Sequence, residues 1–307
     1  MERATSDVQS PSPVPDGRGV GVRAAAGNAA FDHCQPPTSQ LTDSPTYRLT
    51  DLPTRRPTMY GARGRIGLIT LATDTGALQE YTRLMPDGVE VYPAPIVLPR
   101  GEATPAALIE MLAGDQLELA AALLVWAEVD IIVFVCTTGS LVHGVGWDRE
   151  LIGRIEGASG RPATTTTTAV VAALRAVGAT SLAIATPYSD ELNAIEQRFF
   201  EQSGFQIAAM AGLDCATDAE IGRLEPADAV ALVERVDTPD ADAIFISCTN
   251  FHVLQVVDTL ERRFAKPVVT SNLAGAWAAL RGIGITDPVP GHGRLLTLPT
   301  RMEAIAT

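Results

Sequence analysis

The sequence predicts an α/β fold of two similar halves, each with a parallel four-stranded type of sheet, related by a pseudo-twofold axis with the functional site between them. Two observations predict it. From Arg65 onward, short runs rich in Val, Ile and Leu alternate with longer stretches rich in Ala, Leu, Glu and Arg, which is the pattern of a parallel sheet covered by helices. In addition, three segments of the first half recur in the same order in the second.

The apolar runs place the strands and the stretches between them place the helices. Strands are expected near residues 65–71, 88–92, 130–136, 181–186, 205–209, 242–248 and 267–270. Long helical stretches are expected between them, among others at 104–127 and 190–203.

The internal repeat defines the halves. "RIGLITLATD" (65–74) matches "SLAIATPYSD" (181–190), "VDIIVFVCTTG" matches "ADAIFISCTN", and "RPATTTTTAVVAALRAVG" (161–178) resembles "KPVVTSNLAGAWAALRGIG" (266–284). Chance similarity between α/β units can produce one such match more readily than three in order. We therefore expect one half at 63–176 and another at 177–298. Residues 1–62 are rich in Pro, Ser, Thr and Gly without apolar periodicity, and are expected to be a disordered extension.

Composition restricts the partners and cofactors. Asp and Glu outnumber Lys and Arg by 36 to 23 and no basic run occurs, so nucleic acid is not expected. The most apolar window contains Glu128 and Asp130 and is too short to cross a bilayer, and no secretory signal is visible. These features predict a cytoplasmic protein with no membrane partner. The single lysine, Lys266, directly precedes a proline, and the cysteines and histidines lack metal-ligand spacing, so neither a cofactor nor a metal is expected.

Two of the four cysteines, Cys136 and Cys248, stand where a predicted strand ends. Ligands of open parallel sheets bind outside the carboxyl ends of the strands, so the two thiols should face one cleft. A helix that begins after each turn would lower the thiol pKa toward neutrality. Paired thiols suit proton transfer or nucleophilic attack at both faces of a small substrate. Two buried structural cysteines are the alternative interpretation.

The motifs "CTTGS", "ATPYSDELN", "SCTN", "KPVVTSNLAGAWAALR" and "PGHGRLL" resemble the aspartate/glutamate racemase superfamily. Within it they are similar to the branch of maleate cis-trans isomerases, arylmalonate decarboxylases and ectoine-utilisation proteins, over about residues 64–296. The resemblance implies that Cys136 is the nucleophilic or proton-transferring cysteine of the first half and Cys248 its counterpart. It also implies that Thr137, Thr138 and Tyr188 bind a substrate carboxylate, where fixed donors would stabilise developing charge.

Asp74 departs from the pattern that the resemblance implies. Maleate isomerases have an asparagine there, whose amide can donate to substrate, whereas an ionised aspartate cannot donate. Asp74 is expected to contact substrate, as is Thr249 directly after Cys248. Asp74 could accept the proton of Cys136 or hold a cationic group of the substrate; the alternative is that it caps the following helix.

The resemblance favours a cofactor-independent isomerase of a small carboxylate, similar to maleate cis-trans isomerase. An amino-acid racemase or ectoine-utilisation enzyme is the first alternative, because of Asp74, and an arylmalonate-type decarboxylase the second. A ligand-binding regulatory protein is the non-enzymatic alternative. A small carboxylate is the expected partner, and homo-oligomerisation is left open.

Overall fold

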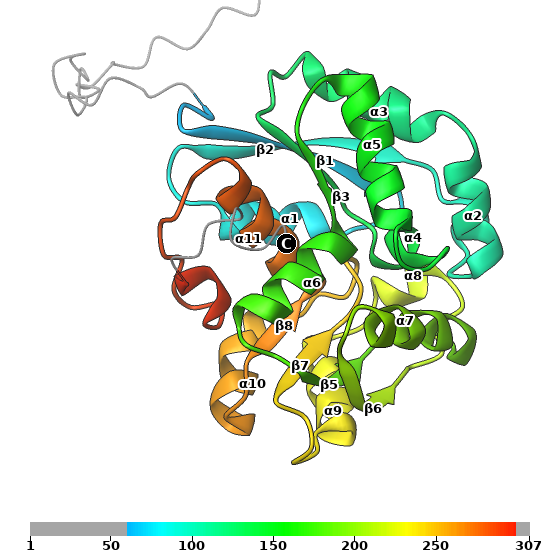
Figure 1. Cartoon of the computed structure of the whole chain (residues 1–307), viewed down its shortest axis with the longest axis vertical. Coiled ribbons are helices and arrows are strands. Elements are labelled where there is room, and N and C mark those ends of the chain that lie inside the picture. Colours follow the sequence, from blue (N-terminus) through cyan, green and yellow to red (C-terminus); the bar gives the residue numbers. More distant parts are fainter. Residues whose placement is uncertain (1–59, 299–307) are drawn as a thin grey trace, which may run out of the picture. The chain divides into compact units, whose positions relative to one another are not determined.

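Two parallel four-stranded sheets flanked by helices make up residues 60–298, the part of the chain that the computed structural model describes (Figure 1). The expected extension, residues 1–62, lies outside the described residues except for its last three positions. The first sheet has the order β2-β1-β3-β4 and the second the order β6-β5-β7-β8. The strands are β1 (Gly64–Leu71), β2 (Val89–Ile96), β3 (Ile131–Phe134), β4 (Ala163–Thr165), β5 (Ser181–Ala185), β6 (Gln206–Ala211), β7 (Ala243–Ile246) and β8 (Val268–Thr270).

The two sheets repeat one topology. Strands β1 and β5 lie at equivalent positions, each between an edge strand and the strand that precedes a cysteine. Strands β3 and β7 are buried along their whole length, as expected for parallel strands covered on both faces. The predicted pair of similar α/β halves is thereby confirmed.

Helices connect the strands and cover the sheets. They are α1 (Ala77–Leu84), α2 (Pro105–Ala113), α3 (Gln116–Val125), α4 (Thr137–Leu141), α5 (Trp147–Ser159), α6 (Thr166–Ala176), α7 (Asp190–Gln202), α8 (Asp218–Ile221), α9 (Pro226–Val236), α10 (Val257–Phe264) and α11 (Ser271–Gly282), with the 3₁₀ turns η2 (Pro99–Gly101), η3 (Leu254–Val256) and η4 (Leu295–Thr297).

The stretch 104–127, expected as one helix, is two. Helix α2 ends at Gly114, whose backbone is extended, and α3 begins after Asp115. Both helices have apolar residues on the buried side, so periodicity alone did not reveal the interruption. No helix within residues 60–298 has the length and apolar character needed to cross a membrane.

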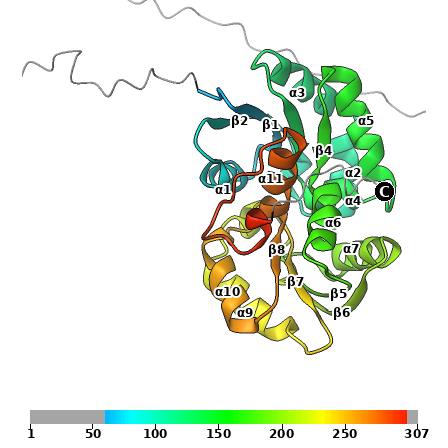
Figure 2. The same cartoon turned by 60° about the vertical axis from the view of Figure 1, so that its left-hand side comes forward.

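Helices α6 and α11 join the halves. They lie side by side in Figures 1 and 2 and pack against one another. Helix α6, which follows the first sheet, also contacts β8 of the second, and α11 contacts β3 and β4 of the first. Apart from its last residue, Gly282, every residue of α11 is buried, including Trp277. Each half is therefore completed by a helix from the other.

Candidate active site

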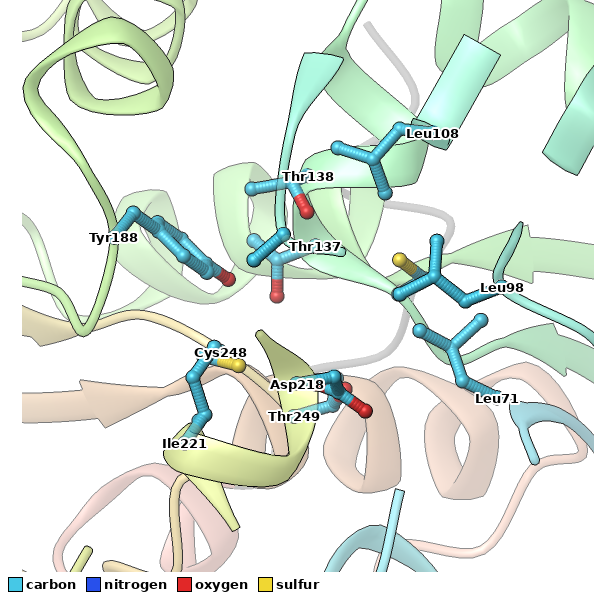
Figure 3. A pocket seen from close by; sticks show the side chains of 12 residues that line it. Leu71, Leu98, Leu108, Thr137, Thr138, Tyr188, Asp218, Ile221, Cys248 and Thr249 are labelled. Atoms are coloured by element: carbon cyan, nitrogen blue, oxygen red, sulfur yellow. The ribbon is translucent and has the colours of Figure 1, made fainter. Parts of the chain in front are cut away.

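The two cysteines predicted to act together line one pocket (Figure 3). Strand β3 ends at Phe134 and β7 at Ile246, so each cysteine comes two residues after its strand. Four other side chains expected at the site line the same pocket: Thr137, Thr138, Tyr188 and Thr249. The carboxyl ends of two separate sheets thus supply one site, as the general rule for open parallel sheets requires.

Cys136 is the N-cap of helix α4. Its Sγ accepts a hydrogen bond from the backbone N–H of Gly139, at 3.3 Å. A Cβ at Gly139 would lie 2.9 Å from that sulfur, so this position has no room for a side chain. Burial raises the pKa of the Cys136 thiol to about 12; the Gly139 amide opposes the rise, and the charges of Asp218 and Asp74 add to it.

No helix begins directly after Cys248. The chain turns, and the next helical segment, η3, starts only at Leu254. Cys248 itself has φ = 95°, a left-handed conformation that costs energy in a residue with a Cβ. Burial and then the charge of Asp218 raise the pKa of the Cys248 thiol well above its ordinary value, while a hydrogen bond from Tyr188 opposes the shift.

These observations correct the prediction of two helix starts that lower both thiol pKa values. A helix follows only Cys136, and both pKa values are raised. The reason is that a one-turn helix contributes a small favourable field, whereas a fully buried thiolate loses its hydration. Both cysteines are therefore held as neutral thiols near neutral pH.

One hydroxyl connects the two cysteine turns across the halves. Ser271, the first residue of α11, accepts a hydrogen bond from the backbone N–H of Cys248 at 3.1 Å. Its Oγ is also 2.8 Å from Oγ1 of Thr137, the residue after Cys136. Since Ser271 has only one hydrogen to donate, giving it to Thr137 leaves the Thr137 hydroxyl hydrogen available to a ligand.

Tyr188 enters the pocket from the loop after β5, and its side chain is buried. The loop is held by Thr186 and Asn193: Thr186 Oγ1 accepts from the Tyr188 N–H, and Asn193 donates to the Tyr188 carbonyl. In Figure 3 its hydroxyl points into the pocket. Burial, together with the nearby Cys248, raises the pKa of Tyr188 well above its ordinary value, so the group is a neutral donor.

Asp74 is the one predicted site residue that does not line the pocket. Its Oδ1 accepts hydrogen bonds from the backbone N–H groups of Gly76 and Ala77, at 2.9 and 2.8 Å, at the start of α1. These two bonds favour the helix-capping alternative for this oxygen, although the N-cap residue of α1 is Gly76. The other, Oδ2, is buried and has no hydrogen-bond partner among the described residues. Burial raises the pKa of Asp74, opposed by those N–H groups and Thr249 and aided by the charge of Asp218.

Asp218 lines the pocket although the sequence did not indicate it. It is the first residue of the four-residue helix α8, and its side chain is buried. Burial raises its pKa, opposed by the side chains of Thr73 and Asn250. Its loop is brought to the first half by a hydrogen bond from the N–H of Ala103 to the carbonyl of Ala216, at 2.9 Å.

The space between these side chains is small. Its volume is about 20 Å³, which holds roughly one water molecule. Apolar residues of both halves complete its wall: Leu71, Leu98, Ala103, Leu108 and Ile221. The pocket therefore combines two thiols, four hydroxyls and one carboxylate within an apolar enclosure.

Comparisons with known proteins agree with this architecture. A family model described as arylmalonate decarboxylase matches residues 85–296. A maleate isomerase of Nocardia farcinica is 30% identical over 184 residues, which cover 58% of this chain and 73% of that protein. An arylmalonate decarboxylase of Bordetella bronchiseptica is 33% identical over 162 residues, which cover 52% of this chain and 68% of that protein.

A solved structure shows the same fold. A mutant of the Nocardia farcinica maleate cis-trans isomerase with a covalently bound succinylcysteine intermediate superimposes with a TM-score of 0.71 at 26% identity. The match covers 76% of this chain and 98% of that one.

Proposed function

The chain belongs to the arylmalonate decarboxylase family, and from this premise we propose that it is a cofactor-independent isomerase of a small carboxylate, similar to maleate cis-trans isomerase. The observation that carries the proposal is the convergence of Cys136 and Cys248, from opposite halves, on one pocket with hydroxyl donors. The covalent succinylcysteine of the Nocardia farcinica enzyme supports a cysteine that bonds to substrate carbon.

Catalysis begins with the loss of the Cys136 proton. The unpartnered Oδ2 of Asp74 is the proposed acceptor, because the charge of Asp74 acts on the Cys136 thiol. The Cys136 thiolate then adds to one carbon of the substrate double bond, and the π electrons move to the carbon beside the carboxylate. Cys248, which burial keeps protonated, delivers its proton to that carbon. The product of these steps is a saturated adduct on Cys136.

The adduct isomerises because its former double bond is now single and can rotate. The Cys248 thiolate takes the proton back, the electron pair re-forms the double bond in the trans arrangement, and Cys136 leaves as a thiolate. Asp74 then returns the first proton. Thr137, Thr138 and Tyr188 are proposed to hold the carboxylate next to the carbanion, where their hydroxyls can donate to the developing charge, and Thr249 to contact the substrate from the second half.

A racemase is the second candidate. With one of the two thiols deprotonated by Asp74, its thiolate can take an α-proton from one face of a carbon while the thiol from the other half gives its proton to the opposite face. That reaction forms no bond between Cys136 and the substrate. Because either reaction needs free thiols, we also propose that the protein works in a reducing compartment, the cytoplasm.

Mass spectrometry after incubation with maleate tests the proposal. We expect an adduct on Cys136 and, by NMR, conversion to fumarate. Cys136→Ser should abolish both, since a serine hydroxyl is far less ionised than a thiol. Cys215→Ser is the matched control, because Cys215 is a buried cysteine that does not line the pocket. Solvent deuterium entering an α-carbon without an adduct would contradict the addition route and favour the racemase.

A further inference from the structure

The pocket has an acceptor without a donor. Asp218 is only 5% exposed and lines the pocket, and its Oδ2 has no hydrogen-bond partner among residues 60–298. The side chains of Thr73 and Asn250 are near enough to oppose the rise of its pKa, but neither is in hydrogen-bonding geometry with this oxygen. The buried Oδ2 of Asp74 is in the same condition. Buried polar atoms are nearly always paired, so an orphaned carboxylate oxygen in a binding pocket indicates a partner supplied by a ligand.

The charge around the pocket is of one sign. Among the described residues, no lysine, arginine or histidine lines it. Asp218 and Asp74 each act on both Cys136 and Cys248, so the two carboxylates lie within electrostatic reach of both sulfurs. A ligand with two carboxylates would place its second negative charge against these acids, and an ionised aspartate has no hydrogen to offer it.

Three of the four hydroxyl donors of the pocket are assigned to one carboxylate in the proposed function. Thr137, Thr138 and Tyr188 can donate to a carboxylate beside the cysteines. Asp218 lies on the loop at the start of α8, which contacts the first half through residues 102–103. When it is ionised, its carboxylate can only accept. The pocket therefore offers three hydroxyl donors to one carboxylate, whereas its wall at Asp218 carries an acceptor with the single hydroxyl of Thr249 beside it (Figure 3).

We propose that Asp218 determines specificity by receiving a hydrogen-bond-donating nitrogen, an amide or an ammonium, at the position where a dicarboxylate would carry its second acid. The substrate class is accordingly a monocarboxylate with a nitrogen donor at its far end. This inference rests on the proposed function only for the reactive carbons and for Cys136. The selection at Asp218 concerns binding and is measurable without turnover.

A comparison of the affinities of close analogues tests whether the pocket prefers a nitrogen donor to a second carboxylate. Succinate, its monoamide and 4-aminobutyrate are compared as ligands of the wild-type protein by calorimetry, because they have no double bond and cannot react. We expect at least one nitrogen ligand to bind tenfold or more tightly than succinate. Turnover is then compared for maleate and its monoamide, which differ only in one oxygen replaced by an amide nitrogen. The monoamide should show a kcat/KM at least tenfold higher.

Substitution of Asp218 should reverse the preference for nitrogen ligands over succinate. Asp218→Asn replaces a carboxylate oxygen by a donor, so succinate should gain affinity about tenfold or more and the nitrogen ligands should lose it. Asp240→Asn is the matched control, because Asp240 is exposed and lies outside the pocket, and its ligand preference should equal that of wild type. Asp218→Ser, which removes the acid without adding an amide, provides the same readout should the asparagine variant fail to fold.

The outcomes separate the two proposals. If wild type binds succinate as tightly as both nitrogen ligands, or if removing the Asp218 acid leaves the preference unchanged, the inference is overturned. A Cys136 adduct with maleate in that case still supports the proposed isomerase. Conversely, a nitrogen preference that depends on Asp218, with no adduct and no isomerisation of any unsaturated acid, would support the inference and overturn the proposed function.

Discussion

Replacing Glu196 by glutamine should stabilise the folded protein, and the gain should grow as the pH rises. Glu196 lies on α7 and is fully buried. Its Oε1 accepts a hydrogen bond from the Ser247 hydroxyl at 2.7 Å, and its Oε2 has no partner within the described part of the chain. Burial raises the pKa of Glu196 from its ordinary value of 4.5 to about 8, opposed only by the Ser247 hydrogen bond.

The sign of the pH effect on stability follows from the number of protons that the folded and unfolded states bind. Between the two pKa values the folded protein retains a proton that the unfolded chain has released, so its free energy of unfolding falls as pH rises. The slope for one group is about 1.4 kcal/mol per pH unit. From 4.5 to pH 7 the loss is about 3 kcal/mol, and it reaches its limit of about 5 kcal/mol near pH 8. Glutamine does not ionise, and its carbonyl can still accept from Ser247.

Urea denaturation of both proteins at pH 5, 6, 7 and 8 measures the effect. The difference in free energy of unfolding should increase by about 1.4 kcal/mol per unit up to about pH 7 and more slowly as the pH approaches the folded-state pKa of about 8. Glu191→Gln is the control: Glu191 lies on the same helix with its side chain exposed, so its replacement should not produce the increase expected for Glu196→Gln. A Glu196→Gln difference that does not change with pH would refute the reasoning.

Three further results are expected. The rate of isomerisation should rise with pH as Asp74 ionises and then level off, because Asp74, whose pKa is raised by burial, must be a carboxylate to accept the Cys136 proton; a rate that keeps rising toward the pKa of Cys136, about 12, would contradict Asp74 as the acceptor. Tyr188→Phe should lower kcat/KM by roughly 10–100-fold in steady-state kinetics, because the substrate loses a donor to its developing charge. An unchanged kcat/KM would show that the Tyr188 hydroxyl does not donate to the substrate. Asn272→Ala should lower the free energy of unfolding by about 1–3 kcal/mol, because Asn272 donates to the buried Glu80 of the other half at 2.8 Å. Urea denaturation at pH 7 measures this, and an unchanged free energy of unfolding would show that the bond does not stabilise the protein.

The sequence predicted the strands whose apolar runs are uninterrupted. Strands β3 and β7 contain only apolar residues, and the repeat located their counterparts at equal spacing. Strand β4 was missed because it lies in "ATTTTT", where threonines provide both the strand and the start of α6. The residue types were compatible with a strand, but a three-residue strand is recognisable only by its pairing with β3.

Site residues were predictable from the sequence where a strand end positions them. They were not predictable where contacts between distant segments bring them to the pocket. Cys136 and Cys248 follow strands, so their meeting could be expected from topology. Asp218 follows an edge strand within "TDAE", a pattern typical of a helix start, and its place at the pocket depends on tertiary bonds, from the Ala103 N–H to its loop and from Asn250 to its own carbonyl. The thiol pKa values also depend on complete burial, which a local helix argument does not contain.

The two sides of the pocket are fastened by different means. On the α6–α11 side, Ser271 bonds to both cysteine turns and Asn272 bonds to Glu80, among tightly packed helices. On the other side, loops alone are joined, by the backbone contacts between residues 102–103 and 216–217 and by Asn250, which accepts from the Thr75 N–H and donates to the Asp218 carbonyl. A space of about 20 Å³ admits no dicarboxylate, so the protein must open before it binds. We expect it to open as a hinge whose axis runs along α6 and α11, with the loops as the gate. Because Ser271, at the start of α11, bonds to both cysteine turns, we expect the cysteines to keep their spacing through each opening and release of product to depend on the gate.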